Sequence, residues 1–133
     1  MPTMIFVNLP VKDLARSREF YGKLGYTFNE QFSDENAICV VISDTIFLML
    51  LVEPFFKTFT KKEIADASGV TEAILAISTD NREAVDELVD KAFAAGASES
   101  NDPDDQGFMY SRSFQDPDGH LWEVLWMDPS AVQ

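Results

Sequence analysis

The chain has 133 residues, of which 46% are hydrophobic, which is enough for one compact domain with its own core. Ten Lys and Arg residues stand against 23 Asp and Glu, and the net charge of -13 disfavours binding to nucleic acid or to anionic membranes, because both are negatively charged. The single cysteine, Cys39, excludes an internal disulfide, and the longest apolar run, residues 46–52, is too short to cross a bilayer, so we expect a soluble cytoplasmic protein.

The first half of the chain predicts one helix and four strands. Residues 4–11 form an apolar extended segment, and Asp13 follows as the expected N-cap of a helix that Gly25 ends. Three further apolar segments are separated by polar turns, as expected of short strands. They cover residues 26–32, 37–42 and 45–51. The predicted order is βαβββ.

Residues 53–69 connect this half to the next and contain three phenylalanines, which is unusual for a solvated linker. Phe55, Phe56 and Phe59 are expected to form a lid or a dimer contact, or to close one end of the core. The sequence leaves these alternatives open.

The second half repeats the pattern. Residues 71–78 predict a strand, Asp80 an N-cap, and an apolar stripe a helix that ends at Gly96. A weak strand over residues 97–100 and two strong strands, 108–115 and 121–126, complete a second βαβββ unit. We therefore predict a single domain with module one at residues 1–52, a connector at 53–69 and module two at 70–133.

The last two strands form a hairpin around Asp-Pro-Asp-Gly at residues 116–119. Alternation puts Glu123 on an otherwise apolar face, where an unpaired buried carboxylate costs roughly several kcal/mol. If Asp116 lies opposite Gly119, Arg112 lies directly across from Glu123. We therefore predict a Glu123–Arg112 ion pair, which a bulge or an odd-length loop would abolish.

Two motifs resemble a known superfamily. They are Val-Lys-Asp-Leu-x5-Phe-Tyr-x3-Gly at residues 11–25 and Asp-Pro-Asp-Gly-x3-Glu at residues 116–123. With the repeated unit, they are similar to the vicinal oxygen chelate superfamily, which includes glyoxalase I, bleomycin-resistance proteins, methylmalonyl-CoA epimerase and extradiol dioxygenases. The resemblance implies an α+β fold in which two βαβββ modules form a curled mixed sheet, and enzymes of the superfamily hold a divalent metal in the resulting cup.

The metal-ligand positions that the resemblance implies fall on Glu123, Phe6, Ile74 and Met49. Only Glu123 is of the residue type that ligates the metal at its position. The chain also has a single histidine, too few for a site built on two. This residue, His120, follows the turn and is expected to be solvated or to cap an edge. We therefore expect no metal and no other cofactor.

The expected site is an apolar cup with a few polar groups, as is usual for small-molecule sites. Glu123 is the candidate catalytic base. The candidate substrate-binding residues are polar Asn8, Arg112 and Tyr110 and apolar Phe6, Met49 and Ile74. Alternatively, the former ligand positions are filled as ordinary core and no pocket exists.

Three functions follow from this site. The first is metal-independent binding of, or catalysis on, a small, partly hydrophobic organic molecule, with Arg112 taking a carboxylate or enolate oxygen. The second is a metal-dependent lyase or dioxygenase of the glyoxalase type, and the third is sequestration of an antibiotic or toxin without turnover. The sequence leaves open whether the protein is an enzyme. The resemblance also implies a homodimer.

Overall fold

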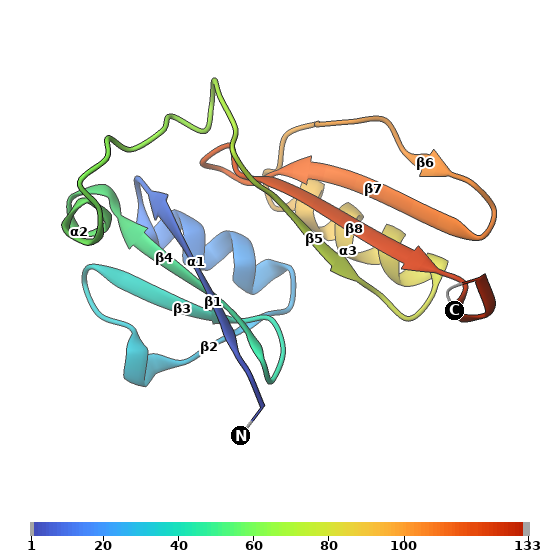
Figure 1. The fold of residues 1–133 in the computed structure, drawn as a ribbon, viewed down its shortest axis with the longest axis horizontal. Coiled ribbons are helices and arrows are strands. Elements are labelled where there is room, and N and C mark those ends of the chain that lie inside the picture. Colours follow the sequence, from blue (N-terminus) through green and yellow to red (C-terminus); the bar gives the residue numbers. More distant parts are fainter. Residues whose placement is uncertain (1, 132–133) are drawn as a thin grey trace. The chain divides into compact units, whose positions relative to one another are not determined.

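The structure is a computed structural model that describes residues 2–131, and the chain divides into two compact units, Met1–Ala65 and Asp66–Gln133. Each unit contains one long helix and one four-stranded mixed sheet (Figure 1). The predicted α+β class and the two modules are therefore confirmed. None of the helices formed by residues 2–131 has both the length and the apolar character needed to cross a membrane.

Unit 1 begins with β1 (Ile5–Val11), α1 (Leu14–Lys23) and β2 (Thr27–Phe28), and continues with β3 (Ala37–Val41) and β4 (Ile46–Val52). The sheet order is β1-β4-β3-β2, with β1 parallel to β4 and the other neighbours antiparallel. The parallel pair places α1 in the connection between β1 and the rest of the sheet, as a βα crossover requires.

The ends of α1 are those that the sequence predicts. The Asp13 carboxylate accepts a hydrogen bond from the Arg16 backbone N–H at 3.2 Å, and Gly25 adopts a φ of 102°, a conformation that favours glycine.

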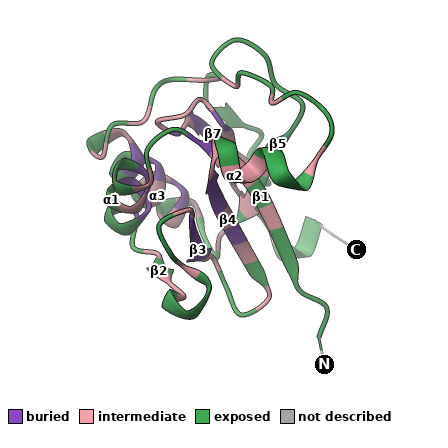
Figure 2. Cartoon of the chain, turned by 90° about the vertical axis from the view of Figure 1, so that its left-hand side faces the viewer, coloured by how far each residue is buried: buried purple, intermediate pink, exposed green. Residues whose placement is uncertain are grey.

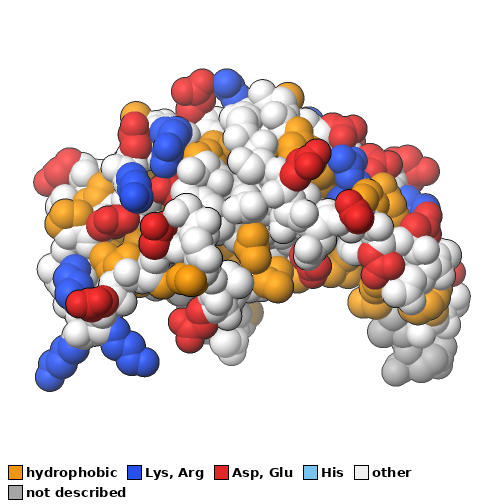
Figure 3. Space-filling view, turned by 90° about the horizontal axis from the view of Figure 1, so that it is seen from above, with side chains coloured by type: hydrophobic (Ala, Val, Ile, Leu, Met, Phe, Trp, Pro, Cys, Tyr) orange, Lys and Arg blue, Asp and Glu red, His pale blue; other side chains and the backbone are white. Residues whose placement is uncertain are grey.

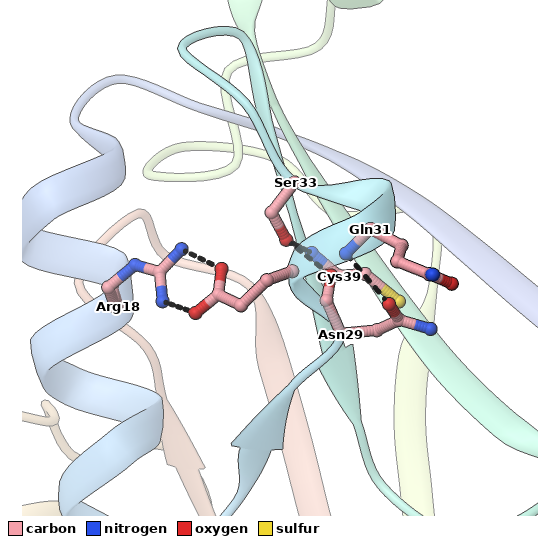
Figure 4. Close-up of polar contacts among 6 residues, drawn as sticks. Arg18, Asn29, Gln31, Ser33 and Cys39 are labelled. Atoms are coloured by element: carbon pink, nitrogen blue, oxygen red, sulfur yellow. Dashed lines mark hydrogen bonds and ion pairs between the residues drawn. The ribbon is translucent and has the colours of Figure 1, made fainter.

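The strand predicted over residues 26–32 is shorter than expected. It ends at Phe28 because the Asn29 side chain accepts a hydrogen bond from the Gln31 backbone at 3.0 Å and starts a 3-10 turn, η1 (Glu30–Phe32). An ion pair between Arg18 and Glu30, 2.9 Å long, ties this turn to α1 (Figure 4). The Ser33 hydroxyl accepts from the Cys39 backbone N–H at 3.2 Å and so links the turn to β3.

The core of unit 1 lies between α1 and one face of its sheet. Phe20 and Tyr21 of α1 are buried, as are Leu48 and Leu50 of β4. The buried residues are concentrated in the central strands β3 and β4 and on the helices (Figure 2). We call the opposite side of the sheet, away from α1, the far face of unit 1.

The connector is partly helical. After β4 the chain forms α2 (Glu53–Phe56) and the 3-10 turn η2 (Lys57–Phe59). The rings of Phe55 and Phe59 meet edge to face with centroids 5.1 Å apart, although Phe59 is exposed.

Unit 2 contains β5 (Ile74–Ser78), α3 (Arg82–Ala94) and β6 (Asp104–Asp105), followed by β7 (Met109–Gln115), β8 (Leu121–Met127) and a last 3-10 turn, η3 (Pro129–Ala131). Its sheet order is β5-β8-β7-β6, with β5 parallel to β8. This is the order of unit 1 repeated, as predicted from the sequence repeat.

Two local predictions in unit 2 are wrong. The N-cap of α3 is Asn81 and not Asp80, because the Asn81 side chain accepts from the Ala84 backbone at 2.7 Å. The weak strand predicted over residues 97–100 is reduced to one bridge between Ser98 and Gln115, and β6 takes its place as the outer strand beside β7.

The core of unit 2 lies between α3 and one face of the sheet. Val85, Val89 and Ala92 of α3 are fully buried, and the strands contribute Phe114, Trp122 and Val124. The far face of unit 2 is the side of this sheet away from α3.

Candidate functional site

The hairpin turn between β7 and β8 sets the register of the candidate site. The Asp116 backbone N–H donates to the His120 carbonyl at 3.0 Å, and the Gly119 N–H donates to the Asp116 carbonyl at 2.9 Å. Asp116 therefore lies opposite His120, and residues 117–119 form a three-residue loop with Gly119 at a φ of 90°. This is a turn followed by a left-handed residue, a common three-residue hairpin connection.

The odd-length loop shifts the strands by one residue from the predicted register. Arg112 pairs with Val124, and Glu123 pairs with Ser113. Because facing residues of an antiparallel pair share a side of the sheet, Arg112 lies on the α3 side and Glu123 on the far face. The predicted ion pair between Arg112 and Glu123 is therefore wrong.

Arg112 is held by two carboxylates of α3. Its Nη1 donates to Asp86 at 2.9 Å and to Asp90 at 3.0 Å, and its side chain is only 19% exposed. The Tyr110 hydroxyl donates to Asp86 at 2.6 Å. The hydrogen bonds from Tyr110 and then from Arg112 lower the pKa of Asp86, and the bond to Asp86 raises the pKa of Tyr110. Both residues predicted for the ligand site thus fasten β7 to α3.

Arg82 extends this group of side chains. It forms a forked pair with Asp105 of β6, with one Nη1–Oδ1 distance of 3.1 Å, and its guanidinium carbon lies 4.6 Å from the centroid of the Tyr110 ring. Charges and rings therefore fill the α3 side of the outer strands.

Glu123 has small neighbours on both sides. In the row of facing residues across the sheet it lies between Ala76 of β5 and Ser113 of β7. The Ser113 hydroxyl is already bonded to the backbone of Asn101, at 2.8 and 3.1 Å. Among residues 2–131, no hydrogen bond or ion pair reaches the half-buried Glu123 carboxylate.

Apolar side chains lie above and below this row. Leu121 and Leu125 flank Glu123 along β8, and Ile74, which pairs with Leu121, is 54% exposed. The far face of unit 2 therefore brings together two of the predicted site residues, Glu123 and Ile74.

The far face of unit 1 holds the other apolar residues of the prediction. In β1, Phe6 and Asn8 point to the far face, because they alternate with residues that point toward the core. Met49 of β4 pairs with Asn8. The Phe6 ring is 47% exposed and stacks on Phe47 with centroids 4.9 Å apart. The Asn8 amide donates to the Phe6 carbonyl at 3.2 Å, so part of its hydrogen-bonding capacity is used within its own strand.

Sequence reasoning missed two residues of that face. Phe47 completes the aromatic pair, and Cys39 pairs with Met49 across β3 and β4. Phe47 could have been found from the sequence, because it lies two residues before Met49 in the strand predicted over residues 45–51 and so shares its face. The Cys39 thiol is buried, which raises its pKa.

The chain is similar to known proteins in part of its sequence and in its fold. The family described as "Bleomycin resistance protein-like N-terminal" matches residues 3–43. A hypothetical protein from S. aureus superposes with a TM-score of 0.79 at 25% identity, covering 95% of this chain and 94% of its own. A glyoxalase/bleomycin resistance protein/dioxygenase family enzyme from Burkholderia phytofirmans PsJN has a TM-score of 0.77 at 19% identity, covering 95% and 99%.

The chain has the fold of proteins described as glyoxalase/bleomycin resistance protein/dioxygenase family members, as the sequence resemblance predicted. The bleomycin resistance determinant encoded on transposon Tn5 shares the fold with a TM-score of 0.66 at 18% identity, over 96% of this chain and 99% of that one. No curated protein sequence matches the chain.

The side chains present do not fit the metal that enzymes of the vicinal oxygen chelate superfamily hold. At the four positions the resemblance assigns to ligands, Phe6 and Ile74 have no donor atom, Met49 has only a weak thioether, and Glu123 alone has a carboxylate. Within residues 2–131, no three His, Cys, Asp or Glu side chains are grouped as a metal site requires. His120 is buried, so of its two predicted roles the solvated one is wrong.

Proposed function

We propose that this protein binds a small, partly hydrophobic organic molecule on the far face of unit 2, without a resident metal. The observation that carries the proposal is Glu123. It is a half-buried carboxylate between Leu121 and Leu125, and no side chain or backbone group of residues 2–131 forms a hydrogen bond or an ion pair with it. A few polar groups on an apolar floor are the usual composition of a small-molecule site.

The far face of unit 1 supports a second contact surface of the same kind. Phe6, Phe47 and Met49 offer an aromatic and thioether surface, and Asn8 adds an amide. Exposed aromatic rings on a sheet face are favourable contacts for flat organic molecules.

Two versions of this function differ in turnover. In the catalytic version, Glu123 acts as a general base on the bound molecule, because a carboxylate without a partner is free to take a proton. In the sequestering version, the molecule is held without chemistry. The match of residues 3–43 to a bleomycin resistance protein-like family favours the second version, with an antibiotic or toxin as the molecule held.

A metal-dependent lyase or dioxygenase is the alternative, and the donor set described above argues against it. We also propose that the protein is a homodimer, because edge strand β1 exposes Ile5 and Phe6. The free buried thiol of Cys39 supports a reducing, cytoplasmic location.

Native mass spectrometry with elemental analysis of the purified protein tests the proposal. We expect a dimer, no stoichiometric zinc, nickel or iron, and an added mass in the range of a small organic molecule. Stoichiometric metal whose loss follows substitution of Glu123 by Gln would contradict a metal-free site.

A further inference from the structure

The net charge of the protein is concentrated in one of its two units. Residues 66–133 contain 15 of the 23 acidic residues and 3 of the ten basic ones, so unit 2 carries a formal charge of -12 out of -13. Figure 3 shows one side of the molecule, where acidic side chains lie exposed among hydrophobic ones. An anionic ligand would meet a repulsive field at unit 2.

All three cations of unit 2 are already paired. Arg112 is bound to Asp86 and Asp90, Arg82 to Asp105, and Lys91 to Glu87 on the surface of α3. Arg112 is also the only Lys or Arg within the eight strands, and it lies on the α3 side of its sheet. The far face of unit 2 therefore presents no strand-borne cation to a ligand.

The charges that this face does carry are negative. Glu123 lies in its middle, and Asp104 of β6 lies on the same face because it pairs with Ser111, which pairs in turn with Leu125. The Asp104 carboxylate accepts hydrogen bonds from the neutral side-chain amide of Gln106, at 3.3 and 3.4 Å. The face thus combines an apolar floor with uncompensated negative charge.

We infer that the ligand is an organic cation, with an ammonium, guanidinium or protonated heterocycle that the Glu123 carboxylate binds and an apolar body that lies on Ile74, Leu121 and Leu125. This inference rests on the proposed function and names its ligand class. It replaces the carboxylate or enolate expected from the sequence, because the arginine that would have bound such an oxygen is engaged elsewhere. On the β5 side of Glu123 the facing residue is the small, exposed Ala76, which leaves room beside the carboxylate.

Three probes of one shape and different charge test the inference. They are 2-naphthylmethylammonium, 2-naphthylmethanol and 2-naphthoate, titrated against the full chain by calorimetry in low salt. We expect the ammonium to bind about tenfold more tightly than the alcohol, as a charge-assisted hydrogen bond contributes, and the naphthoate to bind least.

Two variants locate the effect. Glu123→Gln should weaken ammonium binding about tenfold and leave the alcohol unchanged, whereas Glu87→Gln, an equal change of charge on the exposed side of α3, should leave both unchanged. Thermal melts of both variants establish that they fold.

The possible results separate the two proposals. If the alcohol or naphthoate binds as tightly as the ammonium, or if both variants weaken ammonium binding equally, the cation inference is overturned while the binding face stands. If none of the three probes binds to wild-type protein, the proposed function itself is contradicted.

Discussion

Arg112 and Glu123 lie on opposite faces of one sheet, although they come from adjacent antiparallel strands and are separated by one step of register. Arg112 contacts the carboxylates of α3, and Glu123 faces away from that helix. This single relationship divides the polar groups of unit 2 into a structural set on one side and a candidate binding residue on the other.

Replacing Arg112 should therefore affect stability and not ligand binding. Arg112→Met removes the group that joins Asp86 and Asp90 to β7, and we expect unfolding in urea to become easier by about 1–2 kcal/mol. Lys91→Met, which breaks an exposed pair with Glu87, should change stability by less than about 0.5 kcal/mol. If Arg112→Met lost binding to 2-naphthylmethylammonium without losing stability, Arg112 would be a ligand-binding residue and its structural role would be wrong.

The hairpin turn requires glycine for two reasons. Gly119 has a φ of 90°, and a Cβ added there would lie 2.7 Å from the Ala67 carbonyl oxygen. We expect Gly119→Ala to lower the free energy of unfolding by about 2–3 kcal/mol, from strain and steric overlap together.

Gly25 provides the matched comparison. It has a φ of 102° and nothing within 4 Å of an added Cβ, so Gly25→Ala should cost only about 1 kcal/mol. Chemical denaturation of both variants measures the difference. Equal losses would mean that the contact with Ala67 contributes nothing.

The predictability of this fold from sequence depended on whether a feature is local. The Asp13 cap and the Gly25 stop depend on a few neighbouring residues, and both are as predicted. The choice of Asn81 over the adjacent Asp80 was not predictable, because both side chains are good N-caps.

The candidate site was predicted only in part for a similar reason. Alternation correctly separated Glu123 from Trp122 and Val124 within one strand. The pairing between strands, however, depended on the loop length. Asp116 lies opposite Gly119 in a two-residue loop and opposite His120 in a three-residue loop, and Asp-Pro-Asp-Gly is compatible with both. One residue of difference moved Arg112 and Tyr110 to the other face.

Tyr110 and Asp86 should make stability depend on pH at both extremes. The pKa of Asp86 is lowered by folding, so its contribution is present above its unfolded pKa of about 3.9 and is lost as the pH falls through its folded pKa. The pKa of Tyr110 is raised by the same hydrogen bond, so its contribution is complete below about pH 10 and is lost as the pH rises further.

Tyr110→Phe isolates this bond. In this variant, the loss of stability that Tyr110 causes above about pH 10 should be absent. The loss of stability at acid pH should remain but be smaller, because Arg112 still lowers the pKa of Asp86. Urea midpoints measured from pH 3 to pH 11 test this. An unchanged profile in Tyr110→Phe would show that the hydrogen bond does not form.

Cys39 should be inert in the folded protein. Its side chain is fully buried and burial raises its pKa, so both access and thiolate content are low. With a disulfide reagent such as Ellman's reagent, we expect one equivalent to react rapidly in urea and at least about a hundredfold more slowly in native buffer. Rapid reaction of the native protein would show that the far face of unit 1 is accessible down to β3.

The binding face is tested most directly by the shifts that 2-naphthylmethylammonium causes in the methyl resonances of the full chain, recorded by NMR. We predict shifts at Ile74, Leu121 and Leu125 that require about tenfold more ligand in Glu123→Gln, with the buried Val85 and Val89 of α3 unaffected. Shifts confined to the α3 side, or shifts at the far face that persist unchanged in Glu123→Gln, would contradict this prediction.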